Sequence, residues 1–163
     1  MWRQAIRGAM GRPWGIEAVL KIEALKASDR ARWDALARGY KTFYETTLTD
    51  AEYDRAWARL MQGDDICGLG AHLDGRLVGI THYLFHASAW SANVCYLQDL
   101  FTDPQVRGQG VARALIGGVA DAAKSRAAPR LYWVTHNDNA TARALYDKVA
   151  ACHGFVRYDY AMG

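Results

Sequence analysis

Two glycines stand where an apolar, strand-like segment gives way to a long amphipathic one, in the run Gln105-Val106-Arg107-Gly108-Gln109-Gly110-Val111-Ala112-Arg113. Glycine lets backbone amides come close to a ligand, and the first amides of a helix have no partner inside it. Both features favour an anion such as a phosphate. The GxxxxGK[ST] pattern of phosphate-loop NTPases is absent, and Arg113 stands where a dinucleotide-binding turn needs a third Gly or Ala. Without a further signal, two such glycines are also compatible with an ordinary turn.

Histidines and cysteines are the other residues whose types could do chemistry. His82 and His86 lie four residues apart, which on a strand places them on one face. A metal site would need further ligands near them, so we predict no metal and expect either histidine to line a pocket or relay a proton. The three cysteines form no CxxC pair, which predicts buried, inert thiols, a reducing compartment and a cytoplasmic protein.

The segments around these residues predict an α/β domain with a mixed sheet. Helical periodicity, capping residues and turn signals divide the chain into ten elements. Strands are expected over residues 16–27, 66–73, 76–85, 94–101, 131–135 and 155–160, with Asp74-Gly75 as a type I′ turn. Helices are expected over 29–38, ended by Gly39, from Thr49–Asp50 to Gly63, over 109–126 and over 139–149.

Length and charge limit the classes of function. A chain of 163 residues and 18.1 kDa predicts one domain, over residues 16–163, preceded by an N-terminal arm over 1–15. Arg3, Arg7 and Arg12 supply the whole net charge of +3, because 17 basic residues then face 17 acidic ones from position 13 onward. Because residues 13–163 have no net charge, nucleic acid is not expected as a partner. No apolar run is long enough for a membrane span.

Several motifs together resemble the GCN5-related N-acetyltransferases. Gln105-x-x-Gly108-x-Gly110 is similar to the Q/R-x-x-G-x-G/A signature of that family. Asn139-Ala140-Thr141-Ala142-Arg143-Ala144-Leu145-Tyr146 is similar to its N-x-x-A-x-x-L-Y helix, and Gly154-Phe155 to its closing G-F. The resemblance covers residues 16 to 160 and is closest to the fungal histone/polyamine acetyltransferase branch and its bacterial relatives.

The resemblance implies a fold, a cosubstrate and a set of residues. The implied fold has a mixed, mostly antiparallel central sheet that splays at the fourth strand, with about four helices around it. The implied cosubstrate is acetyl-CoA, with no metal, and the implied assembly is a homodimer. Pyrophosphate would be bound by Arg107, Gly108, Gln109, Gly110, Val111, Ala112 and Arg113, and pantetheine by Leu100, Phe101 and Thr102. Asn139 would also contact acetyl-CoA, and Tyr146 would protonate the departing thiolate.

The acceptor amine needs a base, because an alkyl amine with a pKa near 10.4 is mostly protonated at neutral pH. Related diamine acetyltransferases carry Glu-Asp where this chain has Gln98-Asp99, and Gln98 cannot accept a proton. Asp99 therefore remains as the base, unless a water chain ending on a backbone carbonyl serves and Asp99 is a structural cap. Neighbouring strand positions face opposite sides, so we expect only one of the two to face the acceptor.

Residues expected to bind the acceptor are Tyr44, Glu45, Gln98 and Asp99. Aromatic and acidic side chains attract a cationic amine, which favours a polyamine-like small molecule. A protein lysine or N-terminus is the alternative acceptor. Because Gln98 replaces an acid, a catalytically idle sensor of acyl-CoA is the alternative from another class.

Overall fold

The computed structural model describes residues 18–163, so the predicted arm over residues 1–15 lies outside the described residues. The described part of the chain divides into two compact units, residues 18–133 and 134–163, and each is described by itself. The single domain over residues 16–163 stays a prediction. No helix in the described part combines the length and apolar character that crossing a membrane requires.

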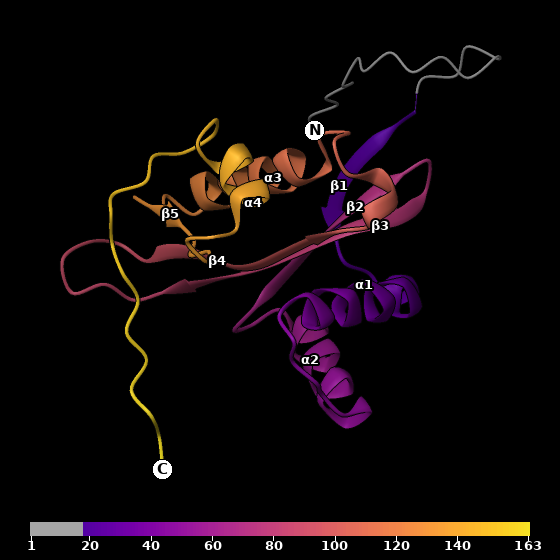
Figure 1. Ribbon diagram of the computed structural model, residues 1–163, viewed down its shortest axis with the longest axis horizontal. Helices are drawn as coiled ribbons and strands as arrows, with labels where there is room; N and C mark the ends of the chain where they lie inside the picture. Colours follow the sequence, from indigo (N-terminus) through magenta and orange to yellow (C-terminus); the bar gives the residue numbers. More distant parts are fainter. Residues whose placement is uncertain (1–17) are drawn as a thin grey trace. The chain divides into compact units, whose positions relative to one another are not determined.

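The first unit is built on a five-stranded sheet with the order β1-β2-β3-β4-β5 (Figure 1). Neighbouring strands from β1 to β4 are antiparallel, and β4 and β5 are parallel. The sheet is therefore mixed and mostly antiparallel, as predicted. Its strands are β1 (Leu20–Ala24), β2 (Cys67–Leu73), β3 (Arg76–His86), β4 (Val94–Thr102) and β5 (Leu131–Tyr132).

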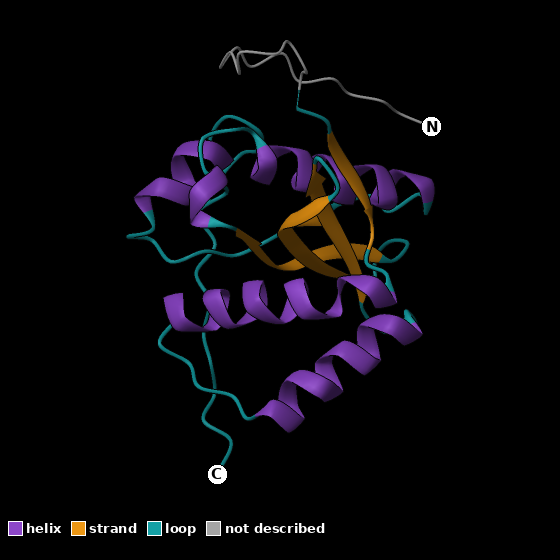
Figure 2. Cartoon of the chain, turned by 90° about the vertical axis from the view of Figure 1, so that its right-hand side faces the viewer, coloured by secondary structure: helices purple, strands orange, loops and turns teal. Residues whose placement is uncertain are grey.

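Helices cover both faces of this sheet. α1 (Arg30–Phe43) and α2 (Asp50–Gln62) lie on one face, and α3 (Val111–Ser125) lies on the other (Figures 1 and 2). Two short 3-10 turns, Ala27–Asp29 and Pro104–Val106, precede α1 and α3. The apolar side chains divide in the same way. One core gathers around Trp33, Leu36, Leu60 and Ile80, and the other around Val78, Val111 and Leu115.

Local sequence signals explain several of these boundaries. Thr49 caps α2 through a reciprocal capping box with Glu52, and Gly63 ends the helix in the left-handed conformation at φ 71°. In the β2–β3 hairpin, Asp74 and Gly75 have φ of 50° and 83°, as a type I′ turn requires. These three predictions of cap, stop and turn are confirmed.

Other boundaries differ from the prediction. α1 continues through Gly39 to Phe43, because the glycine serves packing and does not end the helix: a Cβ there would lie 2.9 Å from the Phe101 ring. β5 has two residues where five were expected, and β1 has five where twelve were expected. Periodicity marks apolar segments, but a strand extends only as far as a neighbour pairs with it.

The second unit contains α4 (Ala140–Tyr146), shorter than the predicted helix over 139–149. The predicted strand over residues 155–160 was wrong, because these residues form no strand. Phe155, Tyr158 and Tyr160 are at least 90% exposed. The alternating pattern that suggested a strand has no hydrogen-bonding neighbour among residues 134–163, and alternation alone cannot supply one.

Two neighbouring glycines in α3, Gly117 and Gly118, should respond in opposite ways to substitution by alanine. A Cβ at exposed Gly117 meets nothing within 4 Å, so Gly117→Ala should raise the free energy of unfolding by about 0.5–1 kcal/mol, the helix penalty of glycine. A Cβ at Gly118 would lie 2.7 Å from Ile22 Cγ2, so Gly118→Ala should lower that free energy by about 1–3 kcal/mol. Urea unfolding of both variants checks the pair, and equal effects would contradict the packing of α3 on β1.

Candidate active site

The glycine turn has the geometry of an anion cradle. Gly108 and Gly110 have φ of 78° and 81°, a conformation that side chains with a Cβ rarely adopt. Gly110 is the N-cap of α3 and supplies no side-chain cap to it. Five successive or near-successive amides donate no hydrogen bond to other residues of 18–133: those of Gly108, Gly110, Val111, Ala112 and Arg113. These amides could bind a pyrophosphate at the positive end of α3.

Asp103 anchors the chain where β4 enters this turn. Its backbone N–H donates to Val78 O at 2.8 Å, and its Oδ1 accepts from Gln105 N at 3.0 Å. Its Oδ2 accepts from Arg32 at 3.1 Å and from Arg76 at 3.4 Å. The Gln105 amide and the Arg32 guanidinium hold the pKa of Asp103 below its usual value. The start of the turn is thus tied to α1 and to the β2–β3 hairpin.

These contacts predict how stability depends on pH. A carboxyl whose pKa is lowered by folding stabilises the protein above its unfolded pKa, near 3.9, and loses that contribution as pH falls through the folded value. Asp103→Asn keeps the cap but loses the charge. It should cost about 1 kcal/mol at pH 7 and progressively less below about pH 4. Urea unfolding at several pH values checks this, with Asp121→Asn on exposed α3 as control; a constant difference down to pH 2.5 would count against it.

The strand before the turn leaves one edge open. β3 pairs with β4 along its length, whereas β5 pairs with β4 only at Cys95 and Tyr96. Leu100, Phe101 and Thr102 therefore lie on a strand whose second edge has no partner strand among residues 18–133. An extended ligand with amide groups could pair with this edge as an added strand, and the pantetheine arm of CoA is such a ligand. The residues fit acetyl-CoA: an open strand edge leads to a turn of free amides.

An irregularity in β4 corrects one prediction about its face. The register with β3 shifts between His82, opposite Asp99, and Tyr83, opposite Leu97, so Gln98 is an extra residue. The Thr81 hydroxyl donates to Asp99 O at 2.7 Å beside this bulge. The alternation on which the expectation for Gln98 and Asp99 rested does not hold, because both residues line the same pocket. Which of them faces the acceptor stays a prediction. A bulge interrupts the alternation that the expectation assumed.

That pocket, of about 500 Å³, lies between the sheet and helices α1 and α2, and we call it the β4 pocket. Its wall includes acidic, basic and aromatic side chains. Arg38 binds Asp34 on α1 at 2.7 Å and Asp50 on α2 at 2.6 Å, which fixes the two helices that form the wall. The polar and aromatic lining residues are Trp33, Tyr40, Lys41, Tyr53, Arg59, Asp64, Asp65, His82, Phe85, Gln98 and Asp99.

Three of these residues form a chain of hydrogen bonds. Trp33 Nε1 donates to His82 Nε2 at 2.9 Å, and His82 Nδ1 lies 2.7 Å from Asp99 Oδ1. Trp33 is 2% exposed and His82 is 8% exposed. From the sequence, His82 was one of several candidate residues, and Trp33 was not among them. Their pairing depends on the β3–β4 register, which sequence periodicity does not specify.

Two other predicted acceptor residues lie at the end of α1. Tyr44 is the half-buried C-cap, and burial, together with the charge of Asp99, raises the pKa of its phenol. Its hydroxyl therefore stays protonated at neutral pH and is near enough to Asp99 to respond to that charge. Glu45 is exposed, has a positive φ of 53°, and is not among the residues that line the pocket.

The remaining candidates for metal or covalent chemistry have other partners. His86 Nε2 lies 3.0 Å from the Tyr132 hydroxyl, whereas His82 pairs with Asp99. Among residues 18–163 no group of three His, Cys, Asp or Glu side chains could hold a metal ion. Burial raises the pKa of the Cys95 thiol to about 11, so that thiol is not ionised at neutral pH and is a poor nucleophile.

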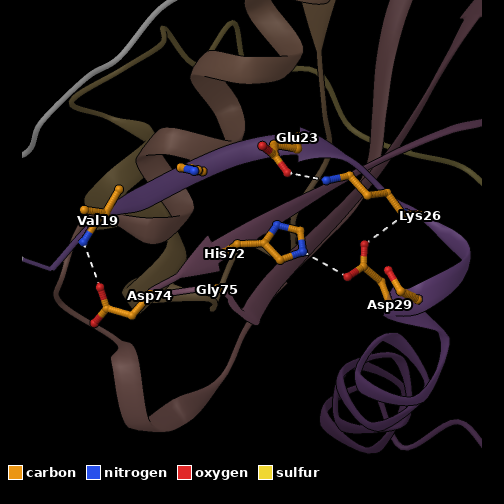
Figure 3. Close-up of a pocket in the computed structure, with 9 residues that line it drawn as sticks. Val19, Glu23, Lys26, Asp29, His72, Asp74 and Gly75 are labelled. Atoms are coloured by element: carbon orange, nitrogen blue, oxygen red, sulfur yellow. Dashed lines mark hydrogen bonds and ion pairs between the residues drawn. The ribbon is translucent and has the colours of Figure 1, made fainter.

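A second cavity, of about 580 Å³, lies beside the edge strand β1 (Figure 3). Its carboxylates each have a partner. Glu23 pairs with Lys26 at 2.6 Å, and Asp29 Oδ1 lies 2.9 Å from His72 Nε2. Asp74 accepts from the Val19 amide at 3.0 Å. With its carboxylates already partnered, this cavity offers a ligand little, and we place the candidate active site at the β4 pocket.

The second unit holds the other two predicted residues. Asn139 is the N-cap of α4: its side chain accepts from Ala142 N at 3.3 Å and donates to Thr135 Oγ1 at 3.2 Å. Tyr146 is the last residue of α4. The roles of Asn139 and Tyr146 toward acetyl-CoA stay predictions.

Known proteins with similar sequences are named as N-acetyltransferases. The chain is 32% identical over 135 residues to the D-amino-acid N-acetyltransferase HPA3 of Saccharomyces cerevisiae, covering 79% of this chain and 83% of that protein. It is 31% identical over 121 residues to a thialysine N-epsilon-acetyltransferase of Sus scrofa, covering 74% and 71%.

Solved structures and a family model agree on the fold. The aminoglycoside acetyltransferase AAC(6')-Iy, solved with a bisubstrate analogue of CoA and acetylneamine, has a TM-score of 0.78 at 17% identity. That match covers 88% of this chain and 99% of the other. Residues 33–151 match the model of the acetyltransferase (GNAT) family. The resemblance inferred from the glycine turn and the α4 motif is confirmed, and this chain belongs to the GNAT family of acetyltransferases.

Proposed function

We propose that this acetyltransferase moves the acetyl group of acetyl-CoA directly onto the primary amine of a small molecule bound in the β4 pocket. One observation carries the proposal: the pocket residues Gln98 and Asp99 are continuous along β4 with the open edge at Leu100–Thr102. An amine beside Asp99 would thus lie next to the strand along which a thioester can extend. The family uses acetyl-CoA, which supplies the activated acetyl group.

In this proposal the chain's own residues bind, polarise and exchange protons. Asp99 would bind the ammonium form of the acceptor and take one proton from it, because only the neutral amine can attack a carbonyl. An amide on the open edge of β4 would stabilise the oxygen of the tetrahedral intermediate. Tyr146 would donate a proton to the departing thiolate sulfur. Because the amine attacks the thioester directly, no covalent enzyme intermediate is needed.

Charges in the pocket bear on the class of acceptor. Asp64, Asp65 and Asp99 would suit a polyamine-like molecule with several ammonium groups. Lys41 and Arg59 line the same pocket and would suit an acceptor that carries a carboxylate as well. Relatives named for D-amino acids and thialysine act on such molecules. We therefore favour an amino acid over a polyamine as the acceptor.

The test is release of free CoA thiol from acetyl-CoA with three classes of acceptor in parallel: amino acids (a D-amino acid and thialysine), spermidine, and a lysine peptide. We expect turnover with the amino acids, and a large loss in the Tyr146→Phe variant. Preference for spermidine would reassign the acceptor, and preference for the peptide would make the protein a lysine acetyltransferase. Tight binding of acetyl-CoA without turnover of any acceptor would favour the idle sensor of acyl-CoA.

We also propose a homodimer and a cytoplasmic location. The family resemblance supports the dimer, and three cysteines without a disulfide between them among the described residues support a reducing compartment. Light scattering of the purified full chain at several concentrations tests the dimer, and a monomer at every concentration would remove it.

A further inference from the structure

The hydrogen bonds between Trp33, His82 and Asp99 in the wall of the β4 pocket determine which ring nitrogen of His82 carries the hydrogen. The indole Nε1 of Trp33 is a donor only, so His82 Nε2, 2.9 Å away, must accept. In a neutral imidazole the other nitrogen then carries the hydrogen. His82 Nδ1 therefore donates to Asp99 Oδ1 at 2.7 Å. This tautomer leaves Asp99 as the acceptor in its ionised form.

Burial makes this arrangement hard to change. A proton added to His82 Nε2 would place two N–H groups against each other in a site where Trp33 is 2% and His82 is 8% exposed. Trp33 cannot easily turn away, because its ring packs at 5.0 Å on Trp57 and lies under Arg30. The indole thus opposes formation of an imidazolium beside Asp99.

We propose, on the basis of the proposed function, that Trp33 and His82 are positioning residues that keep Asp99 negative and oriented for the ammonium group of the acceptor. A neutral donor orients Oδ1 without cancelling its charge, and Oδ2 is left to receive the amine. An imidazolium would neutralise the carboxylate and compete with the cationic acceptor. The pair therefore holds the carboxylate in place without adding a positive charge beside it.

Other ionisable groups lie near His82 in the same pocket. From α1, α2, the following loop and β4, the ionisable side chains that share its pocket are Tyr40, Lys41, Tyr53, Arg59, Asp64, Asp65 and Asp99. Tyr44 at the end of α1 responds to the charge of Asp99. Of the residues that line the pocket, Trp33 and Asp99 are the ones that hydrogen-bond or pair with the ring nitrogens of His82 in the hydrogen-bond chain described above.

The decisive variant is Trp33→Phe, which removes the indole N–H and keeps an aromatic ring. Without the indole donor, His82 Nε2 can take a proton in this variant, and acid conditions favour that form. The KM for the amine should then rise at pH 5.5 on the order of tenfold, the factor that one pKa unit represents. At pH 8 it should stay near the wild-type value. The kcat should change less than KM at both pH values.

Three further variants separate positioning from general damage. Trp57→Phe alters the same aromatic cluster without touching His82, so its pH profile should follow wild type. His82→Asn keeps a donor for Asp99 that cannot ionise, and should hold the KM for the amine constant with pH. His82→Phe removes the donor and should raise that KM at every pH. An identical profile for Trp33→Phe and wild type would overturn the proposal.

Nitrogen-15 NMR of the histidine rings tests the tautomer without any turnover. Wild-type His82 should show a protonated Nδ1 and a bare Nε2 down to pH 5.5, whereas His82 in Trp33→Phe should titrate. A protonated Nε2 in the wild type would overturn the inference even if the enzyme is active. A protonated Nδ1 in a protein that acetylates none of the acceptors would keep the tautomer and remove the proposed function.

Discussion

Asp99→Asn should lower kcat for the amine acceptor by roughly 100-fold or more, the contribution typical of a positioned general base. Asparagine has the shape of aspartate, and its Oδ1 can still accept from His82 Nδ1, now 2.7 Å from the carboxylate. The substitution therefore removes proton acceptance and negative charge with little change of geometry. The dissociation constant of acetyl-CoA, measured by calorimetry, should stay within about threefold of wild type.

The pH dependence of the same variant separates a base from a structural cap. Without Asp99 as proton acceptor, turnover should depend on amine that is already neutral. Its rate should therefore rise about tenfold for each pH unit below the pKa of the amine, near 10.4. Asp121→Asn on the exposed face of α3 provides the matched chemical change outside the site and should leave kcat unaltered. A loss of less than threefold in Asp99→Asn would point instead to a water chain ending on a backbone carbonyl.

Much of the fold was predictable because its signals are local. The cap at Thr49, the stop at Gly63 and the turn at Asp74-Gly75 each depend on a few adjacent residues, and all three are found. The glycine turn was equally readable, since positive φ at Gly108 and Gly110 follows from residue type and spacing.

The rest of the candidate site was not predictable because it depends on pairing between distant segments. Gln98 reaches the pocket through a bulge, and a bulge is a property of the register between β3 and β4. Trp33 and His82 are 49 positions apart, and nothing in the pattern of either segment indicates their hydrogen bond. Gly39 illustrates the reverse error: a residue that often ends helices lies inside one because Phe101 packs on it.

Gly108→Ala should raise the KM for acetyl-CoA by roughly 10- to 100-fold. Alanine costs about 1–2 kcal/mol at the φ of 78° found there, and the turn can relieve that strain only by changing the direction of its amides. A hydrogen bond from an amide to a charged oxygen contributes about 1.5–3 kcal/mol, so one lost contact with the pyrophosphate accounts for the expected factor. The KM for the amine should change little, because Gly108 is not among the residues that line the β4 pocket.

Gly75→Ala is the matched control, because it separates strain from loss of a ligand. Gly75 has φ 83°, and a Cβ at either glycine meets nothing within 4 Å, so the two substitutions impose the same backbone cost without a collision. Both variants should therefore lose similar stability in urea, yet only Gly108→Ala should bind acetyl-CoA weakly in calorimetry. Equal weakening in both would assign the effect to general strain. Unchanged binding in both would mean that the amides of the turn do not hold the pyrophosphate, despite the geometry that Gly108 and Gly110 give them.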